Sequence, residues 1–231
     1  MLRGVVAMDG PSGTGKSTVS RRLARESSAA YLDTGAMYRA VTLAVLRAGL
    51  DPSSDEAEKV AVSAAADLRS VTDPSAPAVL LAGENVEAQI RGPEVTGAVS
   101  AVSARPAVRE ALVLHQRRLI DEGLVERGGI VVEGRDIGSV VVPDAPLKVY
   151  LTASEQVRAA RRGAQDRKAG RSGDVEQVLA DVRRRDQFDT TRKTSPLQVA
   201  EDATVLDTDN LSVDDVLYAL LALAVERGLL R

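Results

Sequence analysis

The chain has 231 residues, and 44% of them are hydrophobic, which is enough to bury a core as one domain or as one domain with an insertion. A formal net charge of only −3 argues against a general electrostatic attraction to nucleic acid polymers or to an anionic membrane. Cysteine is absent, which excludes disulfides, thiolate metal sites and cysteine nucleophiles.

Short runs rich in Val and Ile alternate with longer helical patterns, as is typical of an α/β fold with a parallel sheet. In chain order, we expect strands at 4–8, 130–133, 147–151 and 204–206. Helices are expected at 15–27, 154–169 and 213–227, and the last two begin with residue pairs that fit a capping box, Thr152 with Glu155 and Ser212 with Asp215. No run is long and apolar enough to span a bilayer, and we expect a cytoplasmic protein.

The pattern changes between residues 52 and 93. Turn-forming runs at 73–77 and 83–85 separate short strand-like segments, after an Ala-rich helical run. We interpret this region as a small inserted subdomain that contains a sheet with hairpin turns. A second helical region, 94–127, is expected to return the chain to the main sheet.

The strongest motif is a complete phosphate-loop pattern between a strand and a helix, Gly10-Pro11-Ser12-Gly13-Thr14-Gly15-Lys16-Ser17-Thr18. Its glycines allow backbone N–H groups to surround the ATP phosphates, and the helix N-terminus adds partial positive charge. Lys16 is expected to reach the β and γ oxygens, and the Ser17 hydroxyl is expected to ligate Mg²⁺. A glycine-rich turn without a nucleotide is the alternative, and the full spacing argues against it.

Nucleotide binding alone does not distinguish a switch, a motor and a transferase. No Asn-Lys-x-Asp sequence occurs, which argues against a GTPase switch. In the segment 129–136 the apolar run is short, and Arg135 beside Asp136 suits an anionic, hydrogen-bonding acceptor better than it suits water. We therefore favour phosphoryl transfer to a small acceptor.

Several segments together resemble the bacterial cytidylate kinase family, within the nucleoside monophosphate kinases. They are the loop preceded by Met8-Asp9, and the segments 32–39, 133–138, 185–189 and 205–208. The resemblance implies a three-layer P-loop fold with a five-stranded parallel core sheet, a small insertion that binds the monophosphate and a helical lid. It divides the chain into a core (1–51, 94–157 and 175–231), the insertion (about 52–93) and the lid (about 158–174).

The resemblance also implies roles for residues of the acceptor site. Thr34 would lie near the nucleotide, and Asp136 would accept from the exocyclic amine of cytosine, where uracil offers a carbonyl. The other implied acceptor residues are Arg39 and Arg135 on the phosphate, Ser100 and Arg109 on the base, and Arg185, Asp189 and Arg192 on the sugar and phosphate. Catalysis would be charge neutralisation by Lys16, Arg135, Arg185 and Arg192. Met37 and Tyr38 are expected only to pack in a helix.

The lid would carry Arg158, Arg161 and Arg162, with Gly170-Arg171-Ser172-Gly173 as a hinge. Adjacent arginines point different ways on a helix, so only one of Arg161 and Arg162 is expected to approach the phosphoryl group. The expected reaction is Mg²⁺-dependent transfer from ATP to CMP or dCMP by a monomer. Two alternatives remain open: a kinase for UMP, another monophosphate or a hydroxylated metabolite, and a regulatory ATP-binding protein with slow turnover.

Overall fold

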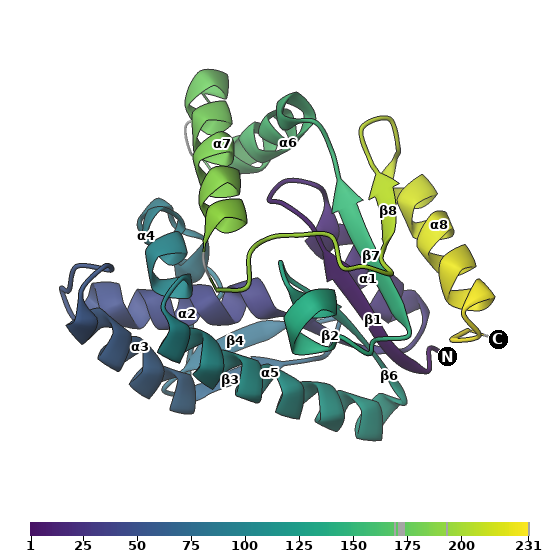
Figure 1. Cartoon of the computed structure of the whole chain (residues 1–231), viewed down its shortest axis with the longest axis horizontal. Coiled ribbons are helices and arrows are strands. Elements are labelled where there is room, and N and C mark those ends of the chain that lie inside the picture. Colours follow the sequence, from purple (N-terminus) through teal and green to yellow (C-terminus); the bar gives the residue numbers. More distant parts are fainter. Residues whose placement is uncertain (169, 171–173, 193, 231) are drawn as a thin grey trace.

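A five-stranded parallel sheet lies at the centre of the computed structural model, which describes residues 1–168, 170, 174–192 and 194–230 (Figure 1). The strand order is β2-β6-β1-β7-β8. The strands are β1 (Gly4–Asp9), β2 (Ala30–Asp33), β6 (Gly129–Glu133), β7 (Leu147–Thr152) and β8 (Thr204–Asp207). The predicted five-stranded parallel sheet is thus confirmed, although no local pattern had indicated β2.

Helices cover both faces of this sheet (Figure 1). Because side chains alternate along a strand, Val6 and Met8 pack with helices α1 (Lys16–Glu26) and α8 (Val213–Glu226). On the other face, Val5 and Ala7 pack with helices α2 (Thr34–Arg47) and α5 (Pro106–Arg127). The result is the predicted three-layer α/β arrangement.

The inserted region folds as helix α3 (Asp55–Ala66), strands β3 (Leu68–Val71), β4 (Ala78–Leu81) and β5 (Glu84–Asn85), and a 3₁₀ turn η1 (Gln89–Arg91). The strands form an antiparallel sheet in the order β3-β4-β5. Its tip is bound to the core: the Tyr31 N–H donates to the Thr72 carbonyl at 2.9 Å, and the Arg21 guanidinium donates to the carbonyls of Pro74 and Ser75 at 2.7 and 2.8 Å.

The helical region at 94–127 is two helices, α4 (Pro93–Ser103) and α5, because Pro106 forces Arg105 into an extended conformation. Further along the chain, helices α6 (Glu155–Lys168) and α7 (Val175–Thr191) stand above the carboxyl edge of the sheet (Figure 1). Residues 169 and 171–173 of the predicted lid, with most of its proposed hinge, lie outside the described residues.

One predicted cap is wrong and one is confirmed. Thr152 ends β7 instead of capping α6, and the Ser154 hydroxyl accepts from the Val157 N–H at 3.4 Å, because the strand continues to Thr152. Ser212 and Asp215 do form a capping box at the start of α8.

Within the described ranges, every helix is too short or too polar to cross a membrane.

Candidate active site

The loop between β1 and α1 holds its backbone in a conformation that needs glycine. Gly10 has a φ of 139°, and a Cβ there would lie 2.1 Å from the Leu151 carbonyl oxygen. Gly13 has a φ of 85°, and its Cβ would lie 3.0 Å from the Arg158 Cβ. Gly15 precedes α1 without a side-chain cap, so the first N–H groups of the helix remain available to an anion.

Lys16 and Ser17 begin α1 at the end of this loop. The Lys16 ammonium donates to the Pro11 carbonyl at 2.7 Å. Burial is the main cause that lowers the pKa of Lys16, and the positive charge of the nearby Arg135 is the second. The Ser17 hydroxyl donates to Oε2 of Glu133 at 2.9 Å. Burial raises the pKa of Glu133, and the Tyr31 hydroxyl donates to its other oxygen. The charged groups of Lys16 and Glu133 are therefore buried together at the place where the phosphates would bind.

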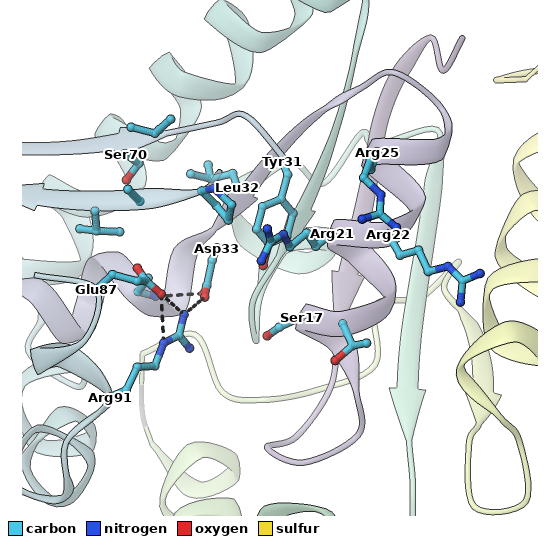
Figure 2. Close-up of a pocket in the computed structure, with 16 residues that line it drawn as sticks. Ser17, Arg21, Arg22, Arg25, Tyr31, Leu32, Asp33, Ser70, Glu87 and Arg91 are labelled. Carbon is cyan, nitrogen blue, oxygen red and sulfur yellow. Dashed lines mark hydrogen bonds and ion pairs between the residues drawn. The ribbon is translucent and has the colours of Figure 1, made fainter. Parts of the chain in front are cut away.

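Asp33 connects β2, α2 and the insertion (Figure 2). Its Oδ1 accepts from the Ala36 N–H at 3.0 Å and so caps α2, while its Oδ2 lies 3.0 Å from the Arg91 guanidinium. Arg91 also pairs with Glu87 at 2.7 Å. A cleft of about 510 Å³ lies between α1 and the inserted sheet, and Ser17, Asp33 and Arg91 line both it and the cavity described next.

A cavity of about 240 Å³ joins the phosphate loop to the residues predicted to bind the acceptor. Helices α2, α5, α6 and α7 and the carboxyl end of β6 contribute to it. Most residues that the sequence predicted for the site line this one cavity: Ser12, Gly13, Gly15, Lys16, Ser17, Thr18, Thr34, Arg39, Ser100, Arg109, Arg135, Asp136, Arg162, Arg185, Asp189 and Arg192.

The arginines of this cavity repel one another. Burial, and then the charge of Arg185, lowers the pKa of Arg39 to about 9. Burial and Arg135 lower the pKa of Arg185 to about 10, and burial and Arg109 lower that of Arg192. A multiply charged anion would relieve this repulsion, so the cavity has the electrostatic character of a phosphate site.

Arg135 is held between the loop and α7. Its Nε lies 3.0 Å from an Asp189 carboxylate oxygen, and its Nη1 donates to the Gly10 carbonyl at 3.2 Å. Burial opposes the charged form, but Asp189 raises the pKa of Arg135 overall. Opposite, the Thr34 hydroxyl donates to the Glu133 carbonyl at 2.7 Å. These contacts bring together the phosphate loop and the residues predicted to bind the acceptor.

At the far end of the cavity, the Arg109 guanidinium forms a buried ion pair with Asp136. It also donates to the Ser103 carbonyl at 3.2 Å and lies 5.3 Å from the centre of the Tyr38 ring. Tyr38 therefore lines the cavity beneath Arg109, in addition to the helix packing that was predicted for it. A planar group with donors and acceptors on its edge would find matching partners here.

The remaining predicted residues lie outside the cavity lining. Gly10, Pro11 and Thr14 belong to the loop and offer carbonyl oxygens to Arg135, Lys16 and Arg161. Arg158 pairs with Asp186 at 2.6 Å, and its Nη1 donates to the Ser12 carbonyl at 3.2 Å. Of the two adjacent lid arginines, Arg162 lines the cavity, whereas Arg161 is bound to Thr208 and Thr14.

Sequence reasoning gave no role to four charged residues of the site, Asp9, Asp33, Arg91 and Glu133. Three of them end parallel strands, and Asp33 lies opposite Glu133 in the register of β2 and β6. The carboxyl ends of parallel strands meet at one edge of a sheet, where ligands bind, so position in the predicted strands was a usable signal for Glu133. The sequence around Arg91 gave no comparable indication, because the position of Arg91 depends on how the inserted region folds.

A parallel sheet with a phosphate loop after its first strand, and with arginines gathered around one cavity, defines a P-loop phosphotransferase fold. A family model described as cytidylate kinase matches residues 6–226. A cytidylate kinase of Rhodococcus opacus (strain B4) is 57% identical over 225 residues, covering 97% of this chain and 96% of that protein. The chain belongs to the cytidylate kinase family.

Other relatives agree with this assignment. A cytidylate kinase of Mycolicibacterium paratuberculosis is 54% identical over 225 residues, covering 97% of this chain and 96% of that protein. Among solved structures, an uncharacterized protein from Eubacterium ventriosum is similar in fold alone, with a TM-score of 0.50 and 11% identity over 95% of this chain and 97% of that chain.

Proposed function

We propose that the chain transfers the γ-phosphoryl group of ATP to CMP or dCMP. An acceptor phosphate oxygen attacks the γ-phosphorus, the bond from the γ-phosphorus to the β–γ bridging oxygen breaks, and ADP leaves. The acceptor phosphate is already ionised near neutral pH, so the site needs no strong base. The observation that carries the proposal is the single cavity in which Lys16 and Ser17 face the acceptor arginines and the Arg109–Asp136 pair.

We assign a task to each residue on which the proposal depends. Lys16, Arg135, Arg185 and Arg192 neutralise the charge of the transferring group, and Arg39 holds the acceptor phosphate. Thr34 and Asp189 hold the rest of the nucleotide. Asp136, with Ser100 and Arg109, reads the cytosine edge, because uracil would leave the Asp136 carboxylate facing a carbonyl. We assign acceptor binding to the insertion at about 52–93 and closure over ATP to the segment at about 158–174.

The residues near Ser17 fit Mg²⁺. The Ser17 hydroxyl and the Glu133 carboxylate lie together and offer the oxygen ligands that Mg²⁺ prefers. In the described part of the chain no cluster of three or more acidic, histidine or cysteine side chains could hold a metal alone, and Mg²⁺ in kinases is bound largely by substrate phosphates. When bound, Mg²⁺ would neutralise charge on the ATP phosphates. We further propose that the protein acts in the cytoplasm as a monomer.

An acceptor screen tests the proposal: ADP release from Mg²⁺-ATP with CMP, dCMP, UMP, AMP, GMP, dTMP or no acceptor. The expected result is strong stimulation by CMP or dCMP. Stimulation by UMP or another compound alone would indicate a kinase for a different acceptor. Equal, slow turnover with every compound would indicate a regulatory ATP-binding protein.

A further inference from the structure

Asp9 is a buried carboxylate between the two halves of the site. It ends β1 and directly precedes Gly10 of the phosphate loop. Its Oδ1 accepts from the Ile137 N–H and its Oδ2 accepts from the Gly138 N–H, both at 2.8 Å. Both donors follow immediately after Asp136. A residue of the ATP side of the site thus holds the segment that carries the acceptor residues.

The turn that Asp9 holds is a π-helical turn over Ile137–Val141, and Asp136 occupies the position before its first residue. An aspartate at such a position ordinarily accepts from the free N–H groups of its own turn. Asp136 makes no such bond. Its carboxylate is instead paired with Arg109, and Asp9 accepts from the two N–H groups.

We infer that Asp9 is a positioning residue for acceptor specificity: by capping the turn in place of Asp136, it keeps the Asp136 carboxylate on Arg109. The inference rests on the proposed function, because it concerns how the cytosine edge is read. Without Asp9, the N–H groups of Ile137 and Gly138 lose their partner while buried, and the carboxylate at the position before their turn is that of Asp136. Asp136 would then turn onto its own N–H groups and leave Arg109.

The tests are Asp9→Asn, which keeps the shape but offers an acceptor to only one of the two N–H groups, and Asp9→Ser for the case that Asp9→Asn folds poorly. The kcat and KM values for CMP, UMP and ATP are measured on protein shown to be folded by circular dichroism. We expect the CMP-over-UMP ratio of kcat/KM to fall about tenfold, mainly through a higher KM for CMP, with the KM for ATP nearly unchanged.

Asp215→Asn is the matched control. The Asp215 carboxylate also accepts two hydrogen bonds at the start of a helix, from the Ser212 N–H at 3.0 Å and the Ser212 hydroxyl at 2.6 Å, but Asp215 is exposed and lies outside the cavity lining. This variant should lose stability and keep the CMP-over-UMP ratio. In an Asp136→Asn background, Asp9→Asn should leave the ratio where Asp136→Asn alone puts it, because both act through Asp136.

An unchanged CMP-over-UMP ratio in folded Asp9→Asn and Asp9→Ser would overturn the inference and reduce Asp9 to a structural residue. So would a further fall of the ratio in the Asp136→Asn background. Failure of the proposed function is distinguishable, because the unaltered protein would then show no stimulation by CMP or dCMP.

Discussion

Arg109 and Asp136 form an ion pair whose side chains are only 3% and 5% exposed. Neither charge has much access to water, so each depends on the other. Asp136→Asn removes the negative charge and leaves the buried Arg109 guanidinium without an anionic partner. We expect the free energy of unfolding in urea to fall by about 3 kcal/mol and the preference for CMP over UMP to fall with it.

The double variant Arg109→Met/Asp136→Leu separates the two effects. It removes both buried charges, so it should regain most of the lost stability, because an apolar pair of similar volume avoids the cost of desolvation. The preference for CMP over UMP should stay low, because the Asp136 carboxylate is still missing. A double variant as unstable as Asp136→Asn would contradict the assignment of the lost stability to an unpaired charge.

Of the two adjacent arginines in the proposed lid, Arg162 lines the cavity, while the Arg161 guanidinium donates to the Thr208 carbonyl at 2.6 Å and the Thr14 carbonyl at 3.3 Å. Arg162→Met should therefore lower kcat about 100-fold, because it removes a positioned charge from the phosphoryl group. Arg161→Met is the matched control. It should change the KM for ATP more than kcat, since it loosens the loop, and an equal loss of kcat would contradict the assignment.

Asp9 makes stability depend on pH in a particular direction. Burial, partly offset by the N–H groups of Gly138 and Ile137, raises its pKa from 3.8 to about 6. The folded protein therefore holds this proton at a pH where the unfolded chain has lost it. The stability that Asp9 contributes falls as pH rises from about 4 to 6, by about 3 kcal/mol, and stays low above that.

Urea unfolding from pH 4 to 7.5 measures this dependence when the unaltered protein is compared with Asp9→Asn, which cannot titrate. The stability of the unaltered protein relative to the variant should decline by about 3 kcal/mol across this range, while other groups cancel. Parallel pH profiles would show that Asp9 does not titrate as expected.

The capping box of α8 supplies a stability test away from the cavity. The Ser212 hydroxyl accepts from the Asp215 N–H at 3.1 Å, and the Asp215 carboxylate accepts from the Ser212 N–H at 3.0 Å. Ser212→Ala should lower the free energy of unfolding by about 1 kcal/mol and leave kcat and KM unchanged. Ser212→Thr keeps the hydroxyl and should lose little, and a loss equal to that of alanine would contradict a capping role.

The sequence allowed the phosphate loop, four core strands and the insertion to be predicted, because each has a local signal: glycine spacing, Val-rich runs or turn residues. Strand β2 was not predicted, because its four residues, Ala30–Asp33, include only a short apolar run. Which of Arg161 and Arg162 faces the cavity could not be predicted either. It depends on Thr208, which is distant in sequence and contacts helix α6 only in the folded chain.

The resemblance supplied the residues that are proposed for the acceptor site, but not their connections. Nothing in the separate motifs indicates that Asp9 caps the turn after Asp136. Ile137, which donates to Asp9, lies 128 positions further along the chain, and the two residues meet because β1 and β6 are neighbours in the sheet. Likewise, the pairing of Ser17 with Glu133 follows from the position of β6 beside β1 and not from either motif.

The hydrogen bond from the Tyr31 N–H to the Thr72 carbonyl affects whether two copies of the protein can pair through the edges of their sheets. β2 is an outer strand of the central sheet, and an open outer strand invites pairing with another chain. The insertion occupies part of that edge. On the opposite side β8 has four residues and ends in Asp207, which disfavours extension there. The segment proposed to bind the acceptor therefore also covers part of a sheet edge that could otherwise pair with another chain.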